Sequence, residues 1–201
     1  LEPFPYILTE GSLTPSEMES VDKELKFLKS IMRPAELSGS ARGADGNPLK
    51  RNLSIALKEV YRSQEFSSIL KALGGTLLDN FQVQDSTKAS DRGLKHWLLN
   101  NMSIGASITM VSYYGEGDYY LPHRDNTVLT AVTFISEEYE SDEGFSGGDL
   151  TFTDYDITIP FKHNSTIIFP GCIRHEVSKV SASEGKGRFS IVQGGYVSYE
   201  L

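Results

Sequence analysis

The second half of this 201-residue sequence opens on the residues SITMVSYY at positions 107–114, a run rich in β-branched and aromatic side chains. Residues of these types favour β-strands. Similar short runs continue almost to the end of the chain, and turn residues such as Gly115, Gly117 and Gly147-Gly148 separate them. Many short strands at this spacing predict an antiparallel sandwich or barrel. The strands are expected at 107–114, 127–135, 149–153, 157–161, 166–169, 176–180 and 188–199.

The first half of the sequence predicts helices instead. Thr14-Pro15-Ser16-Glu17 combines a capping threonine, a proline at the first helical position and a glutamate that can close a capping box. Apolar residues then recur at three- and four-residue steps until Pro34, which is expected to end the helix. These inward-facing positions are Met18, Val21, Leu25, Leu28 and Met32.

Two further helices are expected before the strands begin. One starts after Ser63 and ends at Gly74-Gly75, and the other lies at about 92–101. The residues that the first of them should bury are Phe66, Ile69, Leu70 and Leu73. Residues 35–50 contain few apolar groups and are expected to form a loop, either a lid over the functional site or an ordinary surface loop.

The composition is typical of a soluble globular protein, with 39% hydrophobic and 23% charged residues. The 19 basic and 27 acidic residues give a formal net charge of −8, which argues against a nucleic-acid or anionic-membrane partner. Cys172 is the only cysteine, so no internal disulfide can form, and a reducing, cytoplasmic location is expected. We expect Cys172 to be buried at the start of a strand. The chain begins at Leu1, and a targeting segment before it is left open.

The candidate metal ligands are His123, Asp125 and His175. Residues two apart in an extended segment point the same way, so His123 and Asp125 can chelate one ion. Two imidazoles and a carboxylate can occupy one face of iron(II) and leave the other face for a co-substrate and dioxygen. Such a pair often arises by chance. The order of the downstream motifs favours a metal site over unrelated surface residues: Gly147-Gly148, Phe169-Pro170, His175 and Arg188-Phe189-Ser190.

Residues from about 106 to 197 resemble the double-stranded β-helix core of the iron(II)- and 2-oxoglutarate-dependent dioxygenases, and most of all the prolyl 4-hydroxylase-like group. The resemblance rests on Tyr113 through Asp125, Leu129-Thr130, Gly147-Gly148-Asp149-Leu150, Phe169-Pro170 with His175-Glu176-Val177, and Arg188-Phe189-Ser190. It implies an α+β, mainly β fold in which residues 1–201 form a single domain. A jelly-roll core at about 106–201 would pack on a helical support at about 1–105.

The resemblance also implies roles for individual residues. His123, Asp125 and His175 would bind Fe(II). Arg188, helped by Ser190, would pair with the distal carboxylate of the co-substrate 2-oxoglutarate through its guanidinium fork. Tyr113 and Thr130 would line the co-substrate pocket. The implied activity is hydroxylation of a C–H bond with release of succinate and CO2, and ascorbate can serve as reductant.

Two departures from the group leave the substrate open. Phe134 stands where a tyrosine often contacts the co-substrate, and Gly194-Gly195 stand where a tryptophan is common near the substrate. A prolyl residue in a peptide or protein is the leading substrate. The alternatives are a free amino acid or another small molecule, and a jelly-roll module that binds metal or ligand without turnover. Tyr119 and Tyr120 could line the substrate mouth or simply pack in the strand.

Overall fold

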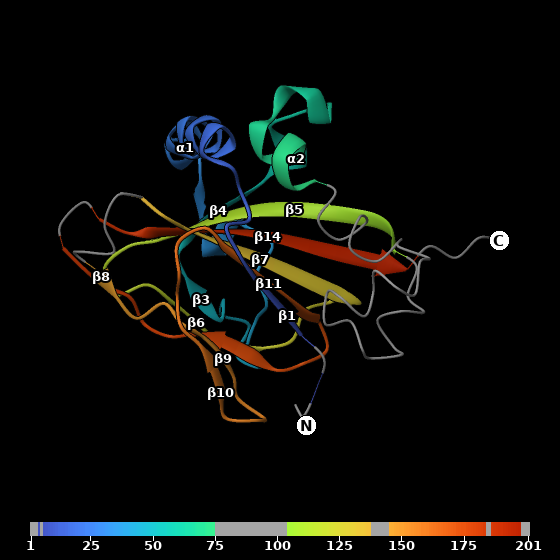
Figure 1. The fold of residues 1–201 in the computed structure, drawn as a ribbon. Coiled ribbons are helices and arrows are strands. Elements are labelled where there is room, and N and C mark those ends of the chain that lie inside the picture. The colour runs from blue at the N-terminus through green and yellow to red at the C-terminus, as the bar shows by residue number, and fades with distance from the viewer. Residues whose placement is uncertain (1–3, 5, 75–103, 138–144, 184–185, 198–201) are drawn as a thin grey trace.

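Two antiparallel sheets face each other, and two helices lie over the outer face of the larger sheet (Figure 1). The computed structural model describes residues 4, 6–74, 104–137, 145–183 and 186–197. The larger sheet contains, in order, β1 (Ile7–Glu10), β11 (Ser165–Pro170), β7 (Leu129–Ser136), β14 (Arg188–Val197), β5 (Ile104–Tyr114), β4 (Leu53–Ala56) and β2 (Arg33–Pro34). The smaller sheet contains β10 (Ile157–Ile159), β9 (Leu150–Phe152), β12 (His175–Val177), β6 (Tyr119–His123) and β3 (Lys50–Arg51). A separate pair joins β8 (Phe145–Ser146) to β13 (Ser181–Ala182).

The connections between the two sheets make this fold a jelly roll. From β5 onward the chain passes from the larger sheet to β6 in the smaller one, returns to β7, and crosses again to β9 and β10. It then enters β11, crosses to β12, and ends in β14, which lies between β5 and β7. The predicted mainly β class and jelly-roll core are therefore confirmed.

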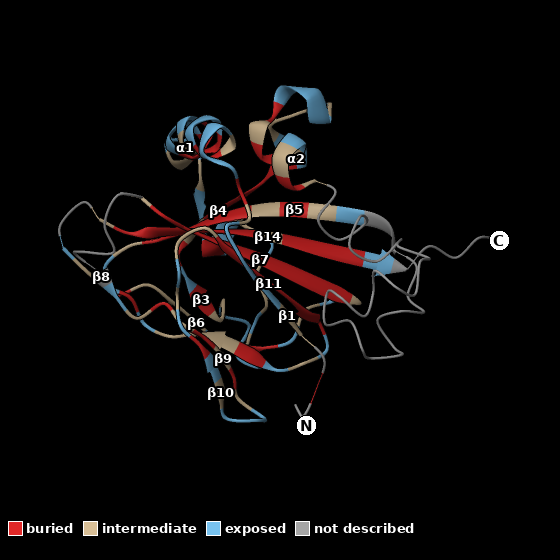
Figure 2. Ribbon diagram, viewed as in Figure 1, coloured by how far each residue is buried: buried red, intermediate tan, exposed pale blue. Residues whose placement is uncertain are grey.

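Helix α1 (Pro15–Lys29) begins where the sequence predicts. The Thr14 side chain accepts from the backbone N–H of Glu17, and the Glu17 carboxylate accepts from that of Thr14, so the capping box is complete. The helix ends before Pro34 because Arg33–Pro34 pairs with β4 as a strand. Its apolar stripe is buried against the outer face of β5, β7 and β14 (Figure 2). That stripe contains Met18, Val21, Leu25 and Leu28, and it packs with Val111, Ile135, Phe189 and Ile191.

The second predicted helix is shorter than expected. Helix α2 spans only Ser68–Leu73, because the Ser67 hydroxyl caps the N–H of Leu70 and so sets the start of the helix. Phe66 lies before this cap in a 3-10 turn (Gln64–Phe66) and is 68% exposed, so the prediction that it is buried is wrong. The third predicted helix, at 92–101, lies outside the described residues.

The part expected to be a purely helical support also contributes strands to both sheets. β1 pairs with β11, β3 with β6, and β4 with β5. The predicted loop at 35–50 contains a 3-10 turn (Ala35–Leu37) and a bridge between Arg42 and Pro48 before it enters β3. These strands are short, and their partners are distant in sequence, so no local pattern reveals them.

Cys172 is exposed, and the prediction that it is buried is wrong. The chain turns after β11, where the Ile173 N–H donates to Pro170 O, and Cys172 lies in that turn. Within the described residues no helix is long and apolar enough to cross a membrane.

Glu24 is a buried carboxylate that joins the two helices. It accepts from the Ser67 hydroxyl at 2.7 Å and from the Ile69 N–H at 3.0 Å. We expect Glu24→Ala to lower the free energy of unfolding by about 1–3 kcal/mol, because it leaves buried donors without an acceptor. Urea unfolding measures this. The matched control is Glu19→Ala on the same helix, whose partner Lys23 is exposed, and an equal loss in the control would contradict the role of Glu24.

Candidate metal centre and adjoining pocket

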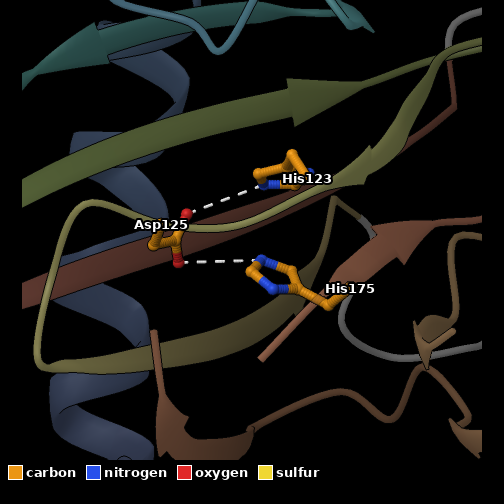
Figure 3. A group of neighbouring side chains, drawn as sticks. All are labelled: His123, Asp125 and His175. Atoms are coloured by element: carbon orange, nitrogen blue, oxygen red, sulfur yellow. Dashed lines mark ion pairs between the residues drawn. The ribbon is translucent and has the colours of Figure 1, made fainter. Parts of the chain in front are cut away.

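The three predicted metal ligands lie together, with one ligand atom of each within 4.8 Å of the others (Figure 3). His123 ends β6 and His175 opens β12, and the two are direct partners in the antiparallel ladder. Asp125 follows β6, held by a hydrogen bond from its N–H to Gly171 O at 2.9 Å. Nε2 of His123 lies 3.6 Å from one Asp125 oxygen, and Nε2 of His175 lies 3.6 Å from the other.

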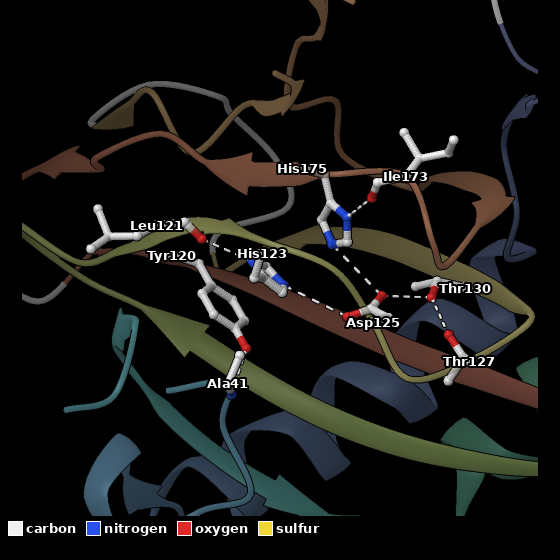
Figure 4. Close-up of polar contacts among 9 residues, drawn as sticks. All are labelled: Ala41, Tyr120, Leu121, His123, Asp125, Thr127, Thr130, Ile173 and His175. Carbon is white, nitrogen blue, oxygen red and sulfur yellow. Dashed lines mark hydrogen bonds and ion pairs between the residues drawn. The ribbon is translucent and has the colours of Figure 1, made fainter. Parts of the chain in front are cut away.

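Hydrogen bonds set the tautomer of both imidazoles. Nδ1 of His123 lies 2.9 Å from Leu121 O, and Nδ1 of His175 lies 2.8 Å from Ile173 O (Figure 4). A carbonyl only accepts, so each Nδ1 carries the proton and each Nε2 presents its lone pair toward Asp125. Burial, with the neighbouring His175, lowers the pKa of His123 to about 4, which keeps that ring neutral at neutral pH. Neutral rings held this way are characteristic of metal ligands.

Asp125 is oriented by a threonine. The Thr130 hydroxyl donates to Asp125 Oδ2 at 2.6 Å, and it also lies 2.8 Å from the Thr127 hydroxyl. Outer hydrogen bonds of this kind position a ligating carboxylate. Two imidazole nitrogens and a carboxylate, with open space beside them, are a donor set that fits Fe(II).

A pocket of about 330 Å³ opens beside these ligands between the two sheets. That volume is within the range of small-molecule sites. Its walls are mostly apolar, with Met110, Val132 and Leu150 among them. Of the predicted co-substrate residues, Thr130 and Ser190 line it, as does Phe134.

Arg188 lies directly behind this wall. Its side chain is fully buried, Nη1 donates to the Ser190 hydroxyl, and Nη2 donates to Gly148 O at 2.7 Å. The guanidinium carbon lies 4.4 Å from the centre of the Tyr114 ring. Burial lowers the pKa of Arg188 to about 10, so the group is cationic at neutral pH. The Ser190 hydroxyl therefore stands between a buried cation and the pocket.

The structure corrects the choice between two adjacent tyrosines. Tyr113 points away from the pocket: its hydroxyl donates to Glu137 at 2.7 Å, and the Lys29 ammonium lies 3.8 Å from the centre of its ring. Tyr114 lines the pocket instead. Successive side chains in a strand point to opposite faces of the sheet. An error of one residue in the alignment therefore places a pocket residue in the core, or a core residue in the pocket. Tyr114 pairs directly with Arg188, and only that pairing identifies it.

Two further residues, Tyr120 and Lys50, line the pocket. The sequence leaves the role of Tyr120 open and does not indicate Lys50. Tyr120 lines the pocket and stacks on His123, with ring centres 3.5 Å apart and an interplanar angle of 12°. Tyr119 does not line it. Lys50 belongs to the segment 35–50 that is predicted to be a loop, and its side chain lines the pocket. Gly194 lines it as well, and a Cβ there would lie 2.5 Å from Thr127 Cγ2, so a large side chain does not fit without movement of Thr127.

Comparisons with known proteins agree with this site. Residues 109–193 match the family model described as the 2OG-Fe(II) oxygenase superfamily. No curated protein sequence matches the chain. Among solved structures, a prolyl hydroxylase from Trichoplax adhaerens, in complex with a hypoxia inducible factor peptide fragment, has a TM-score of 0.64 at 15% identity, with 98% of this chain and 86% of that chain covered.

Two other solved structures share the fold. A prolyl-4-hydroxylase from Pseudomonas putida has a TM-score of 0.63 at 14% identity, covering 99% of this chain and 96% of that one. A viral collagen prolyl hydroxylase from Paramecium Bursaria Chlorella virus-1, in a 2OG complex, has a TM-score of 0.55 at 14% identity, with 96% of each chain covered. The superfamily match over residues 109–193, together with the His-Asp-His site on a fold shared with these prolyl hydroxylases, supports the assignment of this chain as an Fe(II)- and 2-oxoglutarate-dependent dioxygenase.

Proposed function

We propose that the chain hydroxylates a prolyl residue in a peptide or protein and converts 2-oxoglutarate to succinate and CO2. One oxygen atom of O2 enters succinate and the other enters the new hydroxyl group. The observation that carries the proposal is the pair of Nδ1-protonated imidazoles facing Asp125 at the mouth of a pocket that has room for a small ligand.

In this proposal His123, Asp125 and His175 hold Fe(II), and the iron with its co-substrate supplies the oxidising chemistry that no side chain can perform. Thr130 keeps the Asp125 carboxylate in its orientation. Arg188 and Ser190 take the distal carboxylate of 2-oxoglutarate at the Tyr114 end of the pocket, where none of the ion pairs found among the described residues includes the buried guanidinium. The apolar walls exclude water from the bound molecules.

The prolyl substrate is supported by the fold. The Trichoplax adhaerens structure of the same fold contains a peptide fragment. A free amino acid is the second candidate, because Gly194 leaves the substrate side of the pocket without an aromatic wall. We further propose that residues 1–201 act as one domain, since β1, β3 and β4 from the first part complete the two sheets of the core.

The experiment that tests the function is mass spectrometry on a panel of prolyl peptides and free amino acids. The full chain is supplied with Fe(II), 2-oxoglutarate, ascorbate and air, and succinate is measured in parallel. We expect one peptide to gain one oxygen per succinate formed, and to gain none without 2-oxoglutarate. Hydroxylation of free proline alone would favour the second candidate. Succinate formation without oxygen gain on any compound would contradict both.

Gly148 gives a sharper test of the position of Arg188. Its φ is +73°, and a Cβ there would lie 2.7 Å from Arg188 Nε. We expect Gly148→Ala to displace the guanidinium and to raise the 2-oxoglutarate concentration needed for half-maximal succinate formation about 10-fold or more. The matched control is Gly46→Ala, which has a φ of +80° in an open turn with nothing near its Cβ. Equal effects of the two substitutions on the 2-oxoglutarate requirement would contradict the proposal.

A further inference from the structure

Lys50 is a second buried cation at the same pocket. It belongs to β3, outside the residues that match the superfamily, and it is only 5% exposed. Its ammonium donates to the Ser54 hydroxyl at 3.0 Å and lies 5.6 Å from the centre of the Tyr120 ring. Because Tyr120 stacks on His123, Lys50 is separated from the metal ligands by one aromatic ring.

No carboxylate balances this charge within the described part of the chain. Asp118 forms its ion pair with Arg51, the residue after Lys50, at 3.3 Å. None of the other ion pairs found includes Lys50. Burial lowers the pKa of Lys50 to about 8, and at neutral pH most molecules still carry the charge. A buried ammonium group without a counter-charge is costly unless a ligand supplies one.

The two buried cations stand at opposite ends of a row of serines. Ser54, Ser112 and Ser190 are direct neighbours across β4, β5 and β14. Lys50 donates to the first hydroxyl of the row and Arg188 to the last. Neighbouring strands lie about 4.8 Å apart, which puts the two ends of the row about 10 Å from each other. Each end of the row can therefore hold its own anion.

We infer that Lys50 binds a carboxylate group of the substrate at the end of the serine row opposite Arg188. The substrate would then carry an acidic group near the carbon that is hydroxylated. The inference rests on the proposed function in so far as 2-oxoglutarate occupies the Arg188 end. The carboxylate belongs either to an acidic residue beside the target proline or to the main chain of a free amino acid, and binding measurements separate these sources.

The test is calorimetric titration of the full chain loaded with Fe(II) and 2-oxoglutarate in the absence of oxygen. Three matched pairs serve as probes: proline and prolinamide, acetyl-Asp-Pro-amide and acetyl-Asn-Pro-amide, and acetyl-Pro-Asp-amide and acetyl-Pro-Asn-amide. In at least one pair we expect the carboxylate to bind about 10- to 100-fold more tightly than the amide, as for a charge-assisted hydrogen bond in a dry site. The pair that shows the difference identifies the source.

Variants assign the preference to Lys50. Lys50→Met should abolish it, Lys50→Arg should keep part of it, and the control Lys162→Met, which removes an exposed cation paired with Glu10, should keep all of it. The 2-oxoglutarate affinity should stay within about twofold in all three variants, and circular dichroism should show an unchanged fold.

Three results would overturn the inference: no carboxylate preference in any pair, a preference that survives in Lys50→Met, or a loss of 2-oxoglutarate affinity in that variant instead. The outcome is separable from that of the proposed function. A Lys50-dependent preference without hydroxylation of any prolyl compound would support the inference and contradict the proposed function. Hydroxylation of a prolyl compound without the preference would support the proposed function and contradict the inference.

Discussion

His175→Ala is expected to abolish oxygenation and Fe(II) binding while the chain remains folded. The substitution removes one of three ligands, and even the loss of an outer hydrogen-bond partner of a ligand typically costs about 10- to 100-fold in metal affinity or activity. In the wild type, Fe(II) under anaerobic conditions should raise the Tm, because it binds the folded state and hardly binds the unfolded one. In His175→Ala this rise should disappear.

The control for this prediction is His163→Ala. His163 lies in the turn before β11 and accepts a hydrogen bond from the Ser136 N–H, at the end of β7 far from Thr130, so it is an imidazole outside the group of metal ligands. Its removal should lower stability slightly and leave the Fe(II)-induced rise in Tm intact. Full activity in His175→Ala, or loss of the metal effect in His163→Ala, would contradict the assignment of ligands.

Most strands of the core could be predicted because their residue types indicate a strand locally. β-branched and aromatic runs alternate with glycine-containing turns from Ile104 to Val197, and the observed strands agree with the expected ones to within a few residues. The strand β6 was predicted only as an extended segment, since it contains Pro122 and two tyrosines rather than a β-branched run. Two of the metal ligands could also be predicted from local geometry, because residues two apart in an extended segment, such as His123 and Asp125, point to the same side.

The features that could not be predicted depend on pairing between distant segments. Ile7 pairs with Ile168, and Lys50 pairs with Tyr120. A strand of two to four residues has no pattern long enough to separate it from a loop. The face of a strand is equally undetermined from sequence: Tyr113 and Tyr114 exchange roles if the register shifts by one residue. Lys50 was missed for both reasons, and it is the residue that distinguishes this pocket from the matched core.

Arg188→Met is expected to weaken 2-oxoglutarate binding without lowering the Tm of the ligand-free protein. In the ligand-free protein the guanidinium is fully buried, donates to Ser190 and Gly148, and has no hydrogen-bond partner at Nε among the described atoms. Replacing a buried charge by an apolar side chain of similar length is often neutral or stabilising. We therefore expect the Tm of ligand-free Arg188→Met to equal or exceed that of the wild type.

The co-substrate should respond in the opposite direction. If Arg188 pairs with the distal carboxylate of 2-oxoglutarate, its removal leaves that carboxylate buried without a partner, which costs about 2–5 kcal/mol, or roughly 30- to several-thousand-fold in affinity. Arg188→Lys should recover part of this loss, since a point charge replaces the two-pronged fork. Titration of 2-oxoglutarate against succinate formation measures the effect, and Arg33→Met, which removes an exposed cation paired with Glu59, is the control. A destabilised Arg188→Met with an unchanged 2-oxoglutarate requirement would mean that Arg188 is a structural cation that holds β14 to Gly148, and that another group, with Lys50 the first to examine, binds the co-substrate.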